Sequence, residues 1–325
     1  MSAKRVFLVG TLGVAASLVF FLAACKSKPI NAKSATAAAD LQSQVQNTND
    51  DAPPADKTGG FDGKRAFAHA VKQVGFGPRP SGSAAIAQLQ EYVQSELTSY
   101  GCKVDVDSFS ADTPAGRLPM KNIVAKVPGD KPGIIMLASH YDTKRIDGFV
   151  GADDGASSTA VMLELARLLC PNHSGHQVWI TFFDGEEAVR FNWQDPDNRY
   201  GSRQMAAKMA MSGELPRVKA LLLADMVGTK NLRFRREADS TKALSDLLWS
   251  TAARLGYSNI FVDESSPTED DHIIFLKRGV PSVDVIDFEI PYWHTVQDTL
   301  DKISAKSLAI TGHVFLESVR QLQSK

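Results

Sequence analysis

From residue 63 onward, short segments with the apolar pattern of strands alternate with longer segments whose apolar residues recur at helical spacing. The first kind predicts strands at residues 103–109, 121–127, 134–139, 178–183, 220–226 and 282–286. The second kind predicts helices at residues 66–74, 84–100, 156–169, 202–211, 242–255, 270–277 and 304–323. Because this alternation is typical of a sheet covered on both faces, we expect one α/β domain, residues 61–325. Its central sheet should be mostly parallel (mixed), twisted and enclosed between helical layers.

The N-terminus has the pattern of a secretory signal. Lys4 and Arg5 precede an apolar stretch that ends in Leu22-Ala23-Ala24-Cys25, which resembles the lipobox of bacterial lipoproteins. We therefore expect residues 1–25 to be a signal peptide with a lipobox, and Cys25 to be the lipidated residue. An uncleaved anchor helix is the alternative.

Residues 26–60 contain almost no large apolar side chains, so we expect a disordered tether there, with a reach of roughly 30 Å. The domain that follows is then held outside the cytoplasmic membrane by an N-terminal lipid anchor, in the cell envelope of a bacterium. The residue after the cysteine is Lys26 and not an aspartate. By analogy with enterobacterial sorting, this favours the periplasmic face of the outer membrane.

Composition adds two expectations. The chain is 43% hydrophobic with a formal net charge of −1, so it offers no electrostatic reason to expect a nucleic acid as partner. The basic run at residues 233–236 is interpreted as a solvated strand face. Cys102 and Cys170 can pair in an oxidising compartment, but two cysteines in so large a domain are more often separate and buried, which is the expectation here.

The chemistry-bearing residues follow the predicted strands. His140 ends one strand, Asp225 ends another, and His294 follows the last strand after a short connection. In open α/β sheets the ligand site lies beyond the carboxyl ends of the strands, so these residues should meet at one edge. The carboxylates expected there are Asp142, Asp153, Asp154, Glu186, Glu187, Asp225, Asp270 and Asp271. So many like charges require a cation among them, and carboxylates combined with two histidines suit zinc.

The adjacent glutamates in TFFDGEEA, residues 181–188, are predicted to have different roles, one in metal binding and one in proton transfer. Neighbouring residues past a strand end point in different directions, so one carboxylate can bind the metal while the other faces the reacting group. We assign Glu187 to the metal and Glu186 to proton transfer. Asp142, two residues after His140, is expected to orient the imidazole of His140.

Seven stretches of this sequence together resemble the zinc-dependent glutaminyl cyclases of the animal type, which are built on the co-catalytic zinc aminopeptidase fold. The resemblance covers residues 63–325, in order. The stretches are GPRPSGS at 77–83, HYDTK at 140–144, FVGADD at 149–154, FFDGEEA at 182–188, YGSR at 200–203, EDDH at 269–272 and WHT at 293–295.

The resemblance implies a role for each matching position. The zinc ligands would be Asp154, Glu187 and His294. Glu186 would move the proton, and Asp225 and Asp271 would be catalytic carboxylates. Trp193, Trp293 and Asp270 would form the substrate pocket. In the aminopeptidase branch, His140 and Asp225 hold a second zinc with Asp154 bridging, so one or two zinc ions are expected. His272 is expected to support the site without binding metal.

The resemblance also implies an activity. A glutaminyl-peptide cyclotransferase converts the N-terminal glutamine of peptides or proteins to pyroglutamate and releases ammonia, so its partners are substrates with a free N-terminus. The alternative is a zinc aminopeptidase that hydrolyses N-terminal residues from extracellular peptides. A further alternative is a binding module that has kept this fold without catalysis, although no ligand position is missing here.

Overall fold

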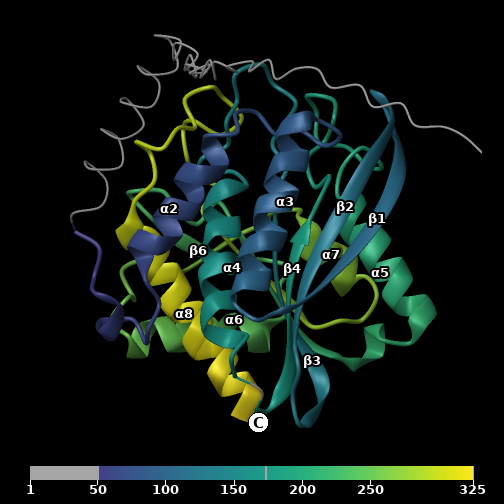
Figure 1. Ribbon diagram of the computed structural model, residues 1–325. Coiled ribbons are helices and arrows are strands. Elements are labelled where there is room, and N and C mark those ends of the chain that lie inside the picture. The colour runs from purple at the N-terminus through teal and green to yellow at the C-terminus, as the bar shows by residue number, and fades with distance from the viewer. Residues whose placement is uncertain (1–50, 173, 325) are drawn as a thin grey trace, which may run out of the picture. The chain divides into compact units, whose positions relative to one another are not determined.

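The computed structural model describes residues 51–172 and 174–324 (Figure 1). The predicted signal peptide, the lipidated Cys25 and the tether up to residue 50 lie outside the described residues. Within the described ranges, none of the helices combines the length and the apolar character that crossing a membrane would require.

A six-stranded mixed sheet forms the centre of the domain, as the sequence predicts. The strand order is β1-β2-β4-β3-β5-β8. The strands are β1 (Lys103–Thr113), β2 (Gly116–Val127), β3 (Lys131–His140), β4 (His176–Phe183), β5 (Val218–Asp225) and β8 (Ser282–Ile286). β4, β3, β5 and β8 run parallel, whereas β1 and β2 form an antiparallel hairpin at one edge. The carboxyl ends of the four parallel strands therefore share one side of the sheet.

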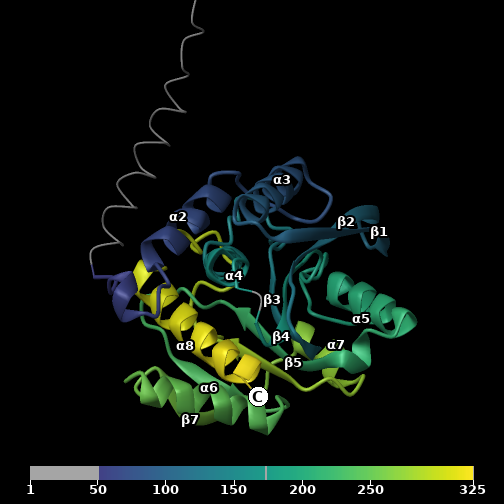
Figure 2. The same ribbon diagram turned by 60° about the horizontal axis from the view of Figure 1, so that its bottom comes forward.

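Helices cover both faces of this sheet, and Figure 2 shows α5 and α7 on one side with α2, α4 and α8 on the other. Alternate residues of β3 belong to two different hydrophobic clusters: Ile135 and Leu137 to the larger, Ile134 and Met136 to the smaller. Since successive side chains of a strand point to opposite faces, a strand buried on both faces reads as one continuous apolar run. The helices are α2 (Gly63–Val74), α3 (Ala84–Ser99), α4 (Ala156–Leu169), α5 (Tyr200–Ser212), α6 (Lys242–Arg254), α7 (Asp271–Leu276) and α8 (Ala305–Ser324), with 3₁₀ turns η1 (Ala55–Lys57) and η2 (Leu215–Arg217).

Two short strands form a separate parallel pair, β6 (Phe234–Glu237) with β7 (Phe261–Ser266). The basic run at residues 233–236 lies on β6 and just before it. Its guanidinium groups are matched by carboxylates: Arg235 pairs with Glu264, and Arg236 pairs with Asp263. Neither strand was predicted from the sequence. In β6, Phe234 is the only apolar residue and the others are charged, so the segment lacks the apolar pattern of a strand.

The predicted boundary of the tether at residue 60 is too late. Residues 51–60 include η1, and the side chain of Thr58 is buried. Phe61 is fully buried against α8, where a Cβ on Gly312 would lie 2.2 Å from the Phe61 ring. A glycine at 312 thus leaves room for the ring that fastens this segment to the domain. The low hydrophobicity of residues 26–60 gave no sign of this contact, because a single aromatic side chain, Phe61, makes it.

The expectation of separate cysteines is wrong, since Cys102 and Cys170 form a disulfide. Cys102 lies between α3 and β1, and Cys170 caps the C-terminus of α4, so the bond ties the connection from α3 to β1 to the end of α4. The two residues are 68 positions apart in the sequence with Cα atoms 5.1 Å apart. That proximity depends on how α3 and α4 pack, which cysteine spacing does not reveal.

Loss of this disulfide should destabilise the domain. A cross-link that closes a loop of this length contributes about 2–4 kcal/mol, chiefly by restricting the unfolded chain, so the Cys102→Ser variant should melt about 5–10 °C lower. Cys170→Ser and the double variant should melt at the same temperature as Cys102→Ser, because each removes the same bond. Thiol titration in denaturant should find two more thiols after reduction than before. An unchanged thiol count would contradict the disulfide.

Candidate metal centre

The predicted site residues converge at the carboxyl ends of the parallel strands. His140 is the last residue of β3, Asp225 is the last residue of β5, and Asp184 follows β4 directly. Asp154 lies in the turn before α4, and His294 lies between β8 and α8. These segments are far apart in sequence, and the parallel strand order is what brings them together.

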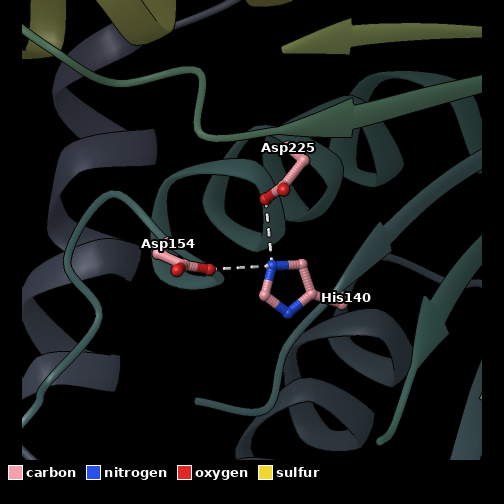
Figure 3. A group of neighbouring side chains, drawn as sticks. All are labelled: His140, Asp154 and Asp225. Carbon is pink, nitrogen blue, oxygen red and sulfur yellow. Dashed lines mark hydrogen bonds and ion pairs between the residues drawn. The ribbon is translucent and has the colours of Figure 1, made fainter. Parts of the chain in front are cut away.

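Asp154 is shared between two groups of three possible metal ligands. In the first group, Nε2 of His140 lies 2.9 Å from Oδ1 of Asp225 and 3.3 Å from Oδ1 of Asp154 (Figure 3). In the second, Nε2 of His294 lies 3.4 Å from Oδ2 of Asp154 and 3.2 Å from Oε1 of Glu187. Each group offers its donor atoms within 4.8 Å of one another. The ligands expected for one zinc and those expected for a second are therefore both assembled.

Buried carboxylate oxygens without hydrogen bonds show that this arrangement suits a metal. Oδ2 of Asp154 and both carboxylate oxygens of Glu187 are buried and accept no hydrogen bond, although a nitrogen of His294 or Lys144 lies 3.2–3.5 Å from each. A buried charged oxygen without a partner costs several kcal/mol, a cost that a bound cation removes. Imidazole nitrogen with carboxylate oxygen is a donor set that zinc accepts, so these residues fit zinc.

The pKa values of the ionisable groups agree with a need for positive charge. Burial raises the pKa of Glu187, and the neighbouring Asp154 raises it further. Burial also raises the pKa of Asp225. Burial would lower the pKa of His294, but the contacts with Asp154 and Glu187 raise it to about 9. The ionised carboxylates are therefore stable here only with a positive charge beside them. A divalent ion held by these carboxylates and neutral imidazoles would supply that charge.

The two adjacent glutamates face different partners. Oε2 of Glu186 lies 3.8 Å from Nδ1 of His140, whereas Glu187 reaches His294 with Oε1 and lies 3.5 Å from Nζ of Lys144 with Oε2. Burial raises the pKa of Glu186 well above its ordinary range, and Asp270 adds to the shift. Glu186 is absent from both possible ligand groups, so it remains available as a proton acceptor beside the metal site.

Asp142 acts mainly on the backbone of this pair. Its Oδ1 accepts the N–H of Glu186 at 3.1 Å, and its Oδ2 is 3.4 Å from the N–H of Glu187. The expected contact with His140 is longer, 3.7 Å from Nδ1 to Oδ1. Asp142 therefore fixes the turn that presents both glutamates, and its influence on the imidazole is the weaker of the two.

Several supporting residues were missed from the sequence. The carboxylate of Asp298 accepts the N–H of Asp153 at 2.8 Å and the N–H of Asp154 at 3.0 Å. The buried Arg79 donates to the carbonyls of Val150 and Gly151 in the same loop. Asp298 follows His294 by four residues. One short segment therefore supplies the ligand His294 and also holds the loop that carries the ligand Asp154. Only that spacing signals its role. Lys144, buried beside Glu187, lies in the stretch HYDTK, but no role was assigned to it from sequence.

A cavity of about 270 Å³ opens beside the metal site. Asp154, Glu186, Glu187, Asp225, Asp270 and His294 give it a polar floor, and Met226, Ile286, Phe288, Trp193 and Trp293 give it apolar walls. Pro267, Thr268 and Glu269 complete the lining. The residues predicted for the pocket from the resemblance, Trp193, Trp293 and Asp270, thus all line one cavity with the proposed ligands.

The two aspartates at the start of α7 differ in position. Asp270 lines the cavity, whereas Asp271 is fully buried behind it and is not part of the lining. Burial and the neighbouring Asp270 raise the pKa of Asp271 to about 8. Nε2 of His272 lies 2.9 Å from Oε2 of Glu237, away from both ligand groups, so His272 supports the site from behind. Asp153 likewise points elsewhere, accepting the N–H of Gly228.

Comparisons with known proteins agree with this geometry. Residues 122–319 match Peptidase family M28. The chain is 31% identical over 270 residues to the glutaminyl-peptide cyclotransferase of Drosophila melanogaster, covering 73% of this chain and 76% of that protein.

Solved structures agree as well. The glutaminyl cyclase of an Acidobacteriales bacterium has a TM-score of 0.76 and 40% sequence identity, covering 81% of this chain and 95% of that one. The glutaminyl cyclase of Porphyromonas gingivalis has a TM-score of 0.75 and 30% identity, covering 80% and 98%. The sequence and the fold thus agree with these relatives, and the chain belongs to peptidase family M28, among its glutaminyl-peptide cyclotransferases.

Proposed function

We propose that this chain is a zinc-dependent glutaminyl-peptide cyclotransferase, which converts the N-terminal glutamine of peptides or proteins to pyroglutamate with release of ammonia. The observation that carries the proposal is one cavity that combines the ligand group Asp154, Glu187 and His294 with an unliganded carboxylate, Glu186, and a second carboxylate, Asp270. Two relatives that are named for this activity match this chain over about three quarters of their own length.

The reaction joins two groups of a single residue. The α-amine nitrogen of the glutamine attacks its own side-chain carbonyl carbon, a C–N bond closes the five-membered ring, and the bond to the amide nitrogen breaks. Zinc held by Asp154, Glu187 and His294 would supply a Lewis acid for the side-chain amide oxygen. Because both reacting groups belong to one residue, the cavity mainly has to hold them in a reactive arrangement.

Glu186 is placed to move the proton. Its carboxylate takes the proton from the attacking amine and returns it to the amide nitrogen, which leaves as ammonia, so no net proton is consumed. Burial and the neighbouring carboxylates hold the pKa of Glu186 well above its ordinary range, which favours this acceptor and donor role near neutrality.

Asp225 and Asp270 can contact the substrate from the cavity floor. Burial, followed by the charge of Asp225, raises the pKa of Asp270 to about 6, so it can accept or donate a hydrogen bond to the leaving nitrogen. Asp271 was expected in this role from the resemblance, but its place behind the cavity favours Asp270 for the direct contact. Asp271 then acts through Asp270.

A zinc aminopeptidase is the second candidate, and one observation favours it. The group His140, Asp154 and Asp225 offers donors for a second metal ion, as in the co-catalytic branch of the fold. Against it, Trp193 and Trp293 wall the cavity and limit the access of the water that hydrolysis requires.

We also propose that the protein works in the cell envelope of a bacterium, anchored by lipid at Cys25 to the periplasmic face of the outer membrane. The N-terminal sequence supports the anchor, and the disulfide between Cys102 and Cys170 supports an oxidising compartment.

The purified protein should release ammonia from a peptide with N-terminal glutamine, in equal amount to the pyroglutamyl product, and should release no free amino acid. It should leave leucyl-naphthylamide intact. Coupled ammonia detection and mass spectrometry of the peptide measure both, with zinc quantified on the same sample. Free glutamine in place of ammonia would favour the aminopeptidase.

Glu186→Gln and Glu187→Gln should separate proton transfer from metal binding. Glu186→Gln should keep its zinc and lose turnover by about 10²- to 10⁴-fold, because it removes only the proton acceptor. Glu187→Gln should lose zinc, because an amide is a much weaker ligand than a carboxylate. The two variants are matched in size and charge change and differ by one position. Equal zinc loss in both would reverse the assignment.

Cys25→Ser should release the protein from the membrane fraction of expressing cells, because the acylated thiol is the proposed anchor. Radiolabelled palmitate should enter the natural protein and not the variant. Cys102→Ser is the control, since it removes a cysteine of the disulfide but should leave the label in place. Label retained by Cys25→Ser would exclude lipidation at this cysteine.

A further inference from the structure

Arg199 is a fully buried arginine at the end of the loop that carries Trp193. It comes directly before α5. Burying a guanidinium is unfavourable unless neighbouring groups match its charge and its hydrogen bonds. The proposed reaction gives this residue no part. Its contacts therefore have to explain why a charge is buried here.

The backbone at Arg199 is unfavourable for an arginine. Its φ is 50°, in the left-handed region, and it occupies the N-cap position of α5 without capping the helix with its side chain. Asparagine adopts this conformation more readily and would also cap the helix. The backbone N–H of Arg199 donates to the carbonyl of Glu186 at 2.7 Å, a bond that either residue type can make. Local preferences thus do not explain the arginine, so its reason lies in the side chain.

The side chain of Arg199 joins two segments of the cavity lining. On its own loop, Nη2 donates to Oδ1 of Asp195 at 2.6 Å, and the guanidinium carbon lies 5.8 Å from the ring centroid of Trp193. On the segment before α7, Nη1 reaches the carbonyl oxygen of Asp270 at 3.5 Å, and Nη2 lies 3.8 Å from Oε2 of Glu269. Because Trp193, Glu269 and Asp270 all line the cavity, one guanidinium connects its apolar wall to its polar floor.

Other polar groups of the loop do not make this connection. Nε1 of Trp193 is buried and makes no hydrogen bond, so the indole has no polar anchor of its own. Arg203, in the first turn of α5, also pairs with Asp195 and donates to the carbonyl of Pro196. Within the described part of the chain, however, no hydrogen bond or ion pair joins Arg203 to residues 269–270. The polar connection from the loop to that segment thus depends on Arg199.

We propose that Arg199 is a positioning residue for this reaction, and that it holds the indole of Trp193 at a fixed separation from the segment of Asp270. The proposal rests on the proposed cyclase function. A planar guanidinium can donate to two partners and lie over a ring at the same time, which the single ammonium group of a lysine cannot do. Cyclisation needs two groups of one residue in a reactive arrangement, so a loosened cavity should slow turnover more than it weakens binding.

Arg199→Met and Arg199→Lys test the proposal through ammonia release from Gln-Gly-Ala by the zinc-loaded protein. Methionine removes the charge with an apolar side chain, a replacement that buried ion pairs often tolerate, whereas lysine keeps the charge without the planar fork. We expect kcat to fall about ten- to hundredfold in Arg199→Met and about three- to tenfold in Arg199→Lys, with KM changed by less than about threefold in both. Arg190→Met, the same substitution at an exposed arginine of the loop outside the cavity lining, should leave kcat and KM unchanged.

The fluorescence of Trp193 gives a second readout that does not depend on turnover. Acrylamide should quench tryptophan fluorescence more in Arg199→Met than in the natural protein, and this increase should vanish when both proteins also carry Trp193→Phe.

Zinc content should match the natural protein in every variant, because Arg199 contacts none of the proposed ligand side chains. Melting temperature verifies folding, and if Arg199→Met does not fold, Arg199→Lys decides by the same two readouts. A natural kcat in the folded variants, a raised KM at natural kcat, or unchanged quenching would overturn the proposal and leave the cyclase function standing. No ammonia from the natural protein would refute the cyclase function, and the positioning role with it.

Discussion

The concentration of buried carboxylates at one edge of the sheet is the constraint on which the rest of this structure depends. Asp154, Glu186, Glu187, Asp225 and Asp270 are all nearly inaccessible to solvent and lie around one cavity. Like charges at such density are stable only with positive charge among them. The buried Lys144 supplies part of it, and a divalent cation held by Asp154 and the neutral imidazoles of His140 and His294 would supply the rest.

Two further carboxylates keep this arrangement rigid by accepting backbone N–H groups. Asp142 holds the turn that carries both glutamates, and Asp298 holds the loop that carries Asp154. The backbone also adopts the left-handed conformation at His294, with φ of 51°, and at Met226, directly after Asp225, with φ of 44°. Such conformations cost energy and persist where the surrounding contacts impose them, here on or beside a metal ligand. The ligands are thus positioned by their neighbours more than by their own side-chain preferences.

The same fold can support either hydrolysis or cyclisation, because both need a metal and a carboxylate that manages a proton. What separates them is the cavity around that shared centre. Here Trp193, Trp293 and Phe288 give the cavity beside the ligand group an apolar wall. In the proposed reaction the walls would limit the access of water to the carbonyl carbon, while the floor would provide the metal and the carboxylate that both reactions need.

The sequence by itself determined the order of the main helices and of the six strands of the central sheet along the chain, since local patterns report the burial of β3 on both faces and the helical spacing of the covering segments. It also located His140, Glu187 and Asp225, because the ends of parallel strands must meet at one edge. Tertiary structure alone decided contacts between segments that no local pattern connects: the disulfide of Cys102 with Cys170, the hydrogen bond from the backbone N–H of Asp154 to Asp298, and the burial of Asp271 behind the cavity. Periodicity reports which face of an element is buried, whereas these contacts depend on the distance and orientation between elements, which only the packed chain defines.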